Sequence, residues 1–213
     1  MNSLSHACAL RESEDMAQMI LLRHGQSVWN AANKFTGWTD VGLSPKGEEE
    51  ATQAGHDLAQ IAFDIIYTSD LKRAQRTAEI AMSFNSSSNS PPTITDWRLN
   101  ERHYGDLQGL NKDETREKYG DEQVHIWRRS YDTPPPGGES LETCAERTIP
   151  CLEELIIPDL KDGKTVLVAA HGNSLRSIVM HIEGLSKEEV LSLEIPTGIP
   201  IIYEFANDLF IRN

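Results

Sequence analysis

Three short apolar runs divide the chain and predict buried strands. They are Met19–Leu22, Phe63–Tyr67 and Thr165–Ala170. Runs of this length that are apolar at nearly every position are typical of strands covered on both faces. Thr93–Thr95 and Ile199–Phe205 predict two further strands, and Pro200 favours an edge position or a late start for the second.

Amphipathic segments lie between these runs and predict helices. Ser44 and Pro45 are typical of a helix cap and first turn, and apolar residues then recur near one face to about Gln60. Further helices are expected over residues 71–82, 113–119, 121–129, 139–157, 173–182 and from residue 186. Pro150 should kink or divide the helix that contains it. Strands that alternate with helices predict an α/β fold with a mostly parallel sheet.

Two internal segments and the N-terminus show no period. Residues 100–111 and 133–138 are rich in Gly or Pro and predict irregular structure. Residues 1–18 have no apolar core of a signal peptide and are expected to form a flexible tail. Residues 19–213 contain no repeat or linker and are expected to form a single catalytic domain.

Composition and charge exclude several classes of protein. The 213 residues are 38% apolar and 25% charged, which is typical of a globular domain. Because 33 Asp and Glu residues outnumber 20 Lys and Arg residues, the net charge is −13 and a broad nucleic-acid binder is excluded. The longest apolar run, Val166–Ala170, is far shorter than the roughly 20 residues that span a bilayer, so no membrane partner is expected.

The cysteines favour a reducing compartment. Cys8, Cys144 and Cys151 are too few and too irregularly spaced for a disulfide framework. If Cys144 and Cys151 share one helix, they lie about 10 Å apart and cannot bridge. A cytoplasmic protein is therefore expected.

Two of the predicted strands end in a His-Gly pair. Met19–Leu22 continues into Arg23, His24 and Gly25, and Thr165–Ala170 continues into His171 and Gly172. Because ligands gather at the carboxyl ends of strands in an open α/β sheet, we expect both histidines at one edge. Glycine lets backbone N–H groups approach an anion, and a helix that starts after His171 adds its positive end.

A structural role and a metal site are the simpler alternatives for these histidines. A lone histidine is most often a hydrogen-bonded structural residue, but two pairs that each close an apolar strand favour a ligand site. Zinc needs three or four ligands at recognisable spacing, which the other histidines do not supply. The neighbours of the paired histidines are cationic or amidic, which suits an anion better than a metal.

Phosphate is the anion that these residue types fit best. Arginine forks match its oxygens, and Arg23 lies beside His24 while Arg73 opens the helix after the second strand. A neutral imidazole that faces a phosphoryl group can attack it, and a second histidine, if protonated, can neutralise charge on its oxygens. A separate acid must protonate the leaving oxygen, and Glu101 in the irregular segment is the candidate.

Longer motifs surround these residues. They are Leu22–Asn30, Phe35–Trp38, Leu99–Asn111, Trp127–Arg129, Ala170–Leu175 and Ile195–Gly198. Together they resemble the cofactor-dependent phosphoglycerate mutase family of the histidine phosphatase superfamily, over about Met19 to Phe205. Arg-His-Gly alone is shared by the superfamily, whereas the block Glu101–Tyr104, together with Gln108–Asn111 and Ile195–Gly198, is far more specific to the mutases. The resemblance implies a three-layer α/β sandwich, with a mostly parallel central sheet flanked by helices.

The resemblance also implies an activity and residue roles. The enzyme would interconvert 3-phosphoglycerate and 2-phosphoglycerate in glycolysis and gluconeogenesis, primed by 2,3-bisphosphoglycerate and without a metal. His24 would be the phosphorylated nucleophile, Glu101 the proton donor and acceptor, and His171 the stabiliser of the transferring group. The residues implied to hold the substrate are Arg23, Asn30, Thr36, Gly37, Arg73, Arg102, His103, Tyr104, Lys112, Arg128, Arg129, Gly172 and Asn173.

Three points complicate the resemblance. Gln26 stands where the family usually has Glu, and the segment Asp132–Ser140 is much shorter than in the common long members. Consecutive residues on a helix point about 100° apart, so Arg128 and Arg129 share a ligand only if the helix ends there or the ligand lies along it. The sequence leaves open whether the chain forms a dimer or tetramer.

Two other functions stay open at this stage. A phosphatase of the same superfamily would pass the phosphoryl group to water, so the distinction depends on how well the site excludes water. A non-catalytic sensor of phosphorylated metabolites would bind without covalent labelling, although it would not need a nucleophile, an acid and a stabiliser together.

Overall fold

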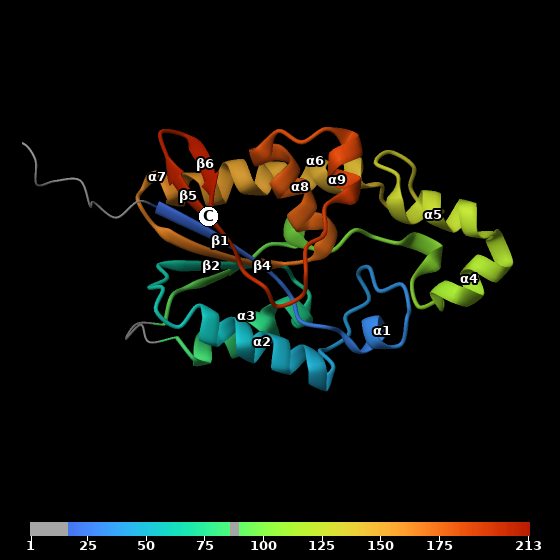
Figure 1. Ribbon diagram of the computed structural model, residues 1–213, viewed down its shortest axis with the longest axis horizontal. Helices are drawn as coiled ribbons and strands as arrows, with labels where there is room; N and C mark the ends of the chain where they lie inside the picture. The colour runs from blue at the N-terminus through green and yellow to red at the C-terminus, as the bar shows by residue number, and fades with distance from the viewer. Residues whose placement is uncertain (1–16, 86–89) are drawn as a thin grey trace, which may run out of the picture.

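The computed structural model describes residues 17–85 and 90–213 (Figure 1). The tail expected over residues 1–18 lies outside the described residues except at its end. Strand β1 (Ala17–Arg23) begins two residues earlier than expected, because Ala17 pairs with Phe205 and Gln18 pairs with Thr165.

A six-stranded sheet forms the centre of the described structure, in the order β3-β2-β4-β1-β5-β6. The other strands are β2 (Ile65–Thr68), β3 (Thr93–Thr95), β4 (Thr165–Ala170), β5 (Ile201–Ala206) and β6 (Leu209–Arg212). β3, β2, β4 and β1 run parallel, whereas β5 and β6 are antiparallel to their neighbours. The mostly parallel sheet is confirmed.

Helices cover both faces of the sheet, which confirms the three-layer sandwich (Figure 1). One face carries α6 (Leu141–Cys151), α7 (Ile157–Lys161), α8 (Gly172–Glu183) and α9 (Lys187–Ser192), and the other carries α2 (Pro45–Asp57) and α3 (Lys72–Ser83). Side chains alternate between the layers, as period-2 geometry requires. Met19 and Leu21 join the core beneath α7 and α8, and Ile20 and Leu22 join the core beneath α2 and α3.

The helix expected over residues 139–157 begins at Leu141, behind the Ser140 cap, and extends further than expected. α6 ends one residue after Pro150, a π-helical stretch η3 (Leu152–Ile156) follows, and α7 continues to Lys161. Pro150 in α6 and Pro158 in α7 both lack an N–H, and the change of helix type lies between them. Cys144 and Cys151 both lie on α6, buried and free, as their spacing predicts.

The C-terminal hairpin was only half predicted. β5 begins after Pro200, so the late start is confirmed, but β5 lies inside the sheet rather than at its edge. The strand β6 was missed. Asn207 and Asp208 both have positive φ, at 53° and 62°, which is the conformation of a tight turn between antiparallel strands.

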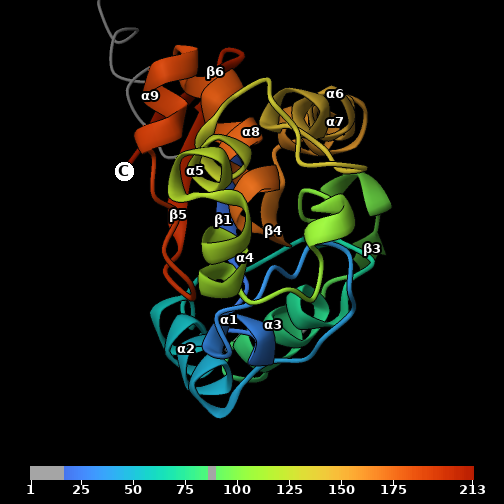
Figure 2. The same cartoon turned by 90° about the vertical axis from the view of Figure 1, so that its right-hand side faces the viewer.

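The remaining elements lie beyond the carboxyl ends of the parallel strands. They are α1 (Val28–Ala31), η1 (Trp97–Leu99), η2 (Gly105–Leu107), α4 (Lys112–Tyr119) and α5 (Asp121–Arg129). Figure 2 shows α4 and α5 in front of β1 and β4. A small separate core of Phe35, Leu107 and Val124 holds this layer together. None of the described helices combines the length and apolarity needed to cross a membrane.

Candidate active site

The two histidines meet at the carboxyl edge of the sheet, as the strand pattern predicts. Arg23 and Ala170 are partners in the parallel β1–β4 ladder, and the residue after each is a histidine. The His24 N–H donates to the Ala170 carbonyl at 3.0 Å, which extends the ladder by one bond. The two imidazole rings therefore lie 4.9 Å apart between centroids, at an angle of 61°.

His24 is held in the form that can act as a nucleophile. Its Nδ1 lies 2.6 Å from the Gly25 carbonyl oxygen. Because that oxygen can only accept, Nδ1 carries the hydrogen and Nε2 keeps its lone pair. Burial lowers the pKa of His24 well below its usual value, and the charges of Arg73 and Arg23 lower it further, so the ring is neutral at pH 7.

His171 is fully buried beside it and is also neutral without a ligand. Its Nε2 lies 2.7 Å from the Ser69 hydroxyl. Burial lowers the pKa of His171 well below its usual value, and Arg73 and His24 add to this effect. A dianionic phosphoryl group nearby would favour the charged ring, because an opposite charge raises the pKa of an imidazole.

The histidine edge opens into a cavity of about 150 Å³ whose wall is strongly cationic. The lining residues with positive side chains are Arg23, Lys34, Arg73, Lys112, Arg128, Arg129 and Arg176. Burial lowers the pKa of Arg73 to about 10. Burial and the charge of Arg128 lower the pKa of Lys112, which reflects how closely these cations are held together. Such a wall favours a ligand with more than one negative charge.

Three buried polar atoms on the cavity wall have no hydrogen-bond partner among the described residues. They are Nε of Arg23, Nε of Arg73 and Oγ1 of Thr36. The rest of the Arg73 guanidinium is fixed, because Nη2 donates to the Gly37 carbonyl at 2.7 Å and Nη1 to the Thr39 carbonyl at 3.1 Å. Buried polar atoms are normally paired, so these three indicate a site built for a polar ligand.

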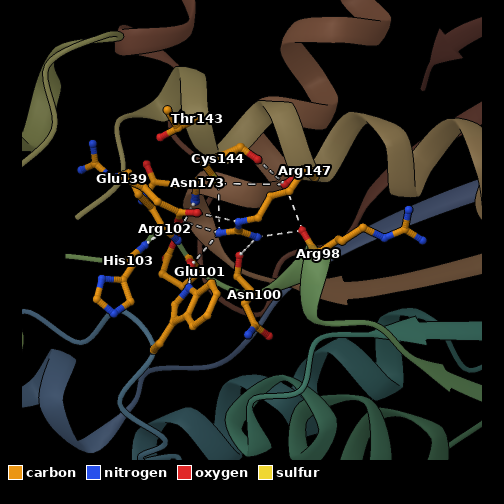
Figure 3. A network of polar contacts seen from close by, with 12 residues as sticks. Arg98, Asn100, Glu101, Arg102, His103, Glu139, Thr143, Cys144, Arg147 and Asn173 are labelled. Atoms are coloured by element: carbon orange, nitrogen blue, oxygen red, sulfur yellow. Dashed lines mark hydrogen bonds and ion pairs between the residues drawn. The ribbon is translucent and has the colours of Figure 1, made fainter. Parts of the chain in front are cut away.

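Glu101 reaches the same cavity from the irregular segment after η1. Its Oε1 accepts hydrogen bonds from the Asn173 backbone and side chain, at 3.1 and 3.0 Å, and from the Arg102 N–H at 2.8 Å. Its Oε2 accepts no hydrogen bond from the described residues and is left for a ligand. Glu101 as a whole is 8% exposed, and Figure 3 shows its side chain close to Asn173 and Arg102.

Most of the residues implied by the resemblance line the cavity together. They are Arg23, His24, Asn30, Thr36, Gly37, Arg73, Glu101, Tyr104, Lys112, Arg128, Arg129, Gly172 and Asn173. α5 ends at Arg129, which allows the consecutive arginines 128 and 129 to face one ligand.

Three of the implied residues lie behind the described wall. His171 lies behind His24. Arg102 lies 4.8 Å from the Tyr104 ring and donates to its hydroxyl at 3.2 Å, so it acts on the cavity through Tyr104. The His103 ring packs 5.3 Å from Trp38 and accepts from the Gly105 N–H, which are contacts of a structural residue.

Four lining residues were missed by the sequence analysis: Lys34, Phe35, Arg176 and Glu194. Arg176 lies four residues after Gly172 on α8, so helical spacing could have found it. Glu194 pairs with Arg129 at 3.2 Å and Arg176 at 3.6 Å, from a loop that no motif marked as functional. Its carboxylate adds negative charge to an otherwise cationic wall.

Two sequence expectations near His24 are revised. The Gly25 N–H donates to the Thr77 hydroxyl at 3.1 Å rather than to a ligand, and Gly25 is needed because a Cβ there would lie 2.1 Å from the Gly47 carbonyl oxygen. Gln26 accepts from the Ser44 hydroxyl at 2.9 Å and is absent from the described cavity wall. The replacement of the family's usual Glu by Gln26 therefore affects the cap of α2 rather than the wall of the cavity.

In residues 17–85 and 90–213, no group of three or more His, Cys, Asp and Glu side chains is arranged to hold a metal ion.

Comparison with known proteins gives one consistent family. The family description "Histidine phosphatase superfamily (branch 1)" matches residues 19–210. The chain is 50% identical to a 2,3-bisphosphoglycerate-dependent phosphoglycerate mutase of Protochlamydia amoebophila, covering 92% of this chain and 99% of the relative. It is 51% identical to the protein of that name in Enterococcus faecalis, and the match covers 92% of this chain and 98% of that relative. Among solved structures, Bacillus stearothermophilus YhfR matches with a TM-score of 0.81 at 28% identity. This match covers 92% of this chain and 95% of YhfR.

Proposed function

Since this chain belongs to the histidine phosphatase superfamily and to its 2,3-bisphosphoglycerate-dependent phosphoglycerate mutases, we propose that the cavity interconverts 3-phosphoglycerate and 2-phosphoglycerate through a phosphohistidine at His24. The observation that carries the proposal is the placement of a neutral His24, 4.9 Å from His171, on a wall of converging cations. A phosphoglycerate carries a phosphate and a carboxylate, so it matches a wall with more positive groups than one phosphate requires.

The first half of the reaction charges the enzyme. The Nε2 lone pair of His24 attacks phosphorus, the N–P bond forms, and the bond from phosphorus to the ester oxygen breaks. Glu101 gives a proton from Oε2 to that leaving oxygen and becomes a carboxylate. Three N–H groups hold Oε1, so the carboxyl group stays oriented through this change.

The second half reverses the roles. The Glu101 carboxylate removes the proton from the accepting hydroxyl, whose oxygen attacks the phosphohistidine, and the N–P bond breaks. In this proposal, His171, Arg23 and Arg73 offset the negative charge of the transferring group. Asn30, Gly172 and Asn173 would complete its binding site. Lys112, Arg128 and Arg129 line the same cavity and would hold the carboxylate end of the substrate.

The wall also fits the primer that the family name implies. The unpartnered Nε atoms of Arg23 and Arg73 would donate to one phosphate, and the cations of α4 and α5 would face the other charged groups. 2,3-Bisphosphoglycerate, when bound, supplies the phosphoryl group that first charges His24.

A coupled assay with 3-phosphoglycerate, run with and without the primer, tests the proposal. We expect primer-dependent isomerisation that is much faster than release of inorganic phosphate. The structural neighbours include a mycobacterial glucosyl-3-phosphoglycerate phosphatase with VO3, which is 26% identical with a TM-score of 0.80, so the fold alone does not separate mutase from phosphatase. Phosphate release that outpaces isomerisation would favour a phosphatase, and binding without turnover would favour a sensor.

The remaining expectations follow from the same proposal. A cytoplasmic location agrees with two buried free cysteines, and fractionation of the cell of origin tests it. A reaction that uses no metal should keep its rate after treatment with EDTA. Light scattering would decide whether the chain forms a dimer or tetramer.

A further inference from the structure

Glu101 lies in a segment that no strand or long helix supports. η1 ends at Leu99 and η2 begins at Gly105, so the intervening backbone has no regular hydrogen-bond ladder of its own. Proton transfer nevertheless needs a carboxyl group held within a few tenths of an ångström. We propose that Arg147 on α6 is a positioning residue that fixes Glu101 through the backbone, an inference that rests on the proposed role of Glu101.

The guanidinium of Arg147 donates hydrogen bonds to backbone carbonyl groups between Arg98 and Glu101 (Figure 3). Nη1 donates to the carbonyl oxygens of Arg98 at 2.8 Å and Asn100 at 3.0 Å, and Nη2 donates to the Glu101 carbonyl at 3.0 Å. One side chain thus fixes three peptide groups of an irregular segment. A planar fork with five N–H groups can do this, whereas an ammonium group cannot.

Glu139 fixes the guanidinium from the opposite side. Its two oxygens accept from Nε and Nη2 of Arg147, both at 2.8 Å, in a two-bonded ion pair. The same carboxylate accepts the His103 N–H at 2.8 Å, just beyond Glu101 in the chain. Arg147 and Glu139 therefore hold the backbone before and after the proton-transferring residue. The charge of Arg147 lowers the pKa of Glu139, against the effect of burial, so the pair is ionised at neutral pH.

Trp38 connects this pair to the cavity wall. Its indole N–H donates to the same Glu101 carbonyl at 2.5 Å, and the Arg147 guanidinium lies 5.5 Å from its ring. Trp38 directly follows Thr36 and Gly37, which line the cavity. The position of the Glu101 backbone and the position of this wall segment are thereby coupled.

Arg147 acts through Glu101 rather than on a ligand. All five of its N–H groups are used by protein acceptors, its side chain is 8% exposed, and it is absent from the described cavity wall. Its loss should therefore impair proton transfer while leaving the anion-binding cations in place.

The test uses two phosphoryl donors with different leaving groups. Phosphorylation of His24 by 2,3-bisphosphoglycerate needs Glu101 to protonate an alkoxide, whereas 4-nitrophenyl phosphate releases a stable anion that needs no proton. We expect Arg147→Met to slow the first reaction by about 10- to 100-fold in single-turnover measurements, and the second by less than about threefold. In steady state, kcat for 3-phosphoglycerate should fall by the same large factor, with little change in KM.

Arg98→Met is the matched control. Arg98 forms a comparable ion pair with Asp96 in the same segment, but its side chain makes no hydrogen bond to Glu101. Its loss should therefore lower thermal stability without the selective kinetic effect. Equal slowing with both donors in Arg147→Met, or an unchanged kcat, would overturn the proposal.

A conservative variant covers the case in which Arg147→Met does not fold. Arg147→Lys keeps the charge beside Glu139 but cannot reach all three carbonyl oxygens, so it should show the same selectivity to a smaller extent. A normal kcat in this variant would also contradict the proposal. If the wild-type enzyme itself were not phosphorylated by 2,3-bisphosphoglycerate, the proposed function would fail instead.

Discussion

The two histidines and Glu101 reach one cavity by different structural routes. His24 and His171 each extend a strand of the β1–β4 ladder, and a backbone hydrogen bond of 3.0 Å sets their spacing. Glu101 stands on an irregular segment whose backbone is held by Trp38 and Arg147 and whose carboxyl group is held by Asn173. Trp38, Arg147 and Asn173 come from distant parts of the chain.

The difference matters for how each group tolerates change. A ladder is redundant, because every residue of β1 from Gln18 to Arg23 pairs with β4. The Glu101 segment depends instead on a few side chains, so single substitutions at a distance can move it. We therefore expect variants of the histidine edge to abolish chemistry at the site itself, and variants around Glu101 to produce graded, leaving-group-dependent losses.

The largest effect should come from the histidine edge. His24→Ala removes the attacking Nε2, so isomerisation and acid-labile labelling by 2,3-bisphosphoglycerate should fall by about 10⁴-fold or more. His181→Ala is the control, because that ring is 41% exposed on α8 and pairs with Glu153. Turnover near the wild-type rate in His24→Ala would refute the assignment of the nucleophile.

The next effect should come from the Glu101 segment. Glu101→Gln keeps the shape and a carbonyl oxygen for the Asn173 bonds but cannot transfer a proton, so kcat should fall by about 10²- to 10⁴-fold. Labelling of His24 by 4-nitrophenyl phosphate should fall far less. Equal losses with both donors would contradict the role of Glu101 as acid and base.

The two regions should lose stability in different pH ranges. His24 and His171 have folded-state pKa values well below the usual 6.5, so below pH 6.5 the unfolded chain binds protons that the folded chain does not. The free energy of unfolding should therefore fall with decreasing pH, by up to about 1.4 kcal/mol per pH unit for each histidine. Glu139 has a folded-state pKa below the usual 4.5, so its contribution is complete above pH 4.5 and is lost on further acidification.

Urea unfolding of the wild type and of His171→Gln from pH 8 to pH 5 measures the contribution of the buried histidines. The variant should show the smaller slope between pH 6.5 and pH 5, because it has lost one of the two buried imidazoles. Equal slopes would mean that His171 is not held neutral in the folded protein.

The smallest effect should come from Glu194 at the cavity. Glu194→Gln frees Arg129 and Arg176 for the ligand, so KM for 3-phosphoglycerate should fall by about two- to fivefold at low ionic strength, with kcat unchanged. The Glu194 side chain is 68% exposed, so added salt should reduce the difference. A higher KM would instead show that Glu194 holds Arg129 in its binding position.

The same contrast explains what the sequence could predict. The apolar runs that precede His24 and His171 predict strands, and neighbouring parallel strands bring their carboxyl ends together. The position of the two histidines at one edge of the sheet could therefore be predicted. The hydrogen bonds from Arg147 and Trp38 to Glu101 could not be predicted from a local sequence pattern, because they join residues 46 and 63 positions apart. Glu194 was missed for the same reason, and β6 was missed because the Asn207-Asp208 turn was not recognised. The irregular segment offered Glu101 as a candidate acid, and its specific role came from the family motifs rather than from spacing.

One pulse-chase experiment tests the central claim most directly. The enzyme is labelled with 2,3-bisphosphoglycerate carrying a radioactive phosphoryl group, and the modified peptide is identified before and after addition of unlabelled 3-phosphoglycerate. We predict an acid-labile label on His24 that passes into phosphoglycerates when the substrate is added. A label on another residue, or a label on His24 that appears only as inorganic phosphate, would contradict the account.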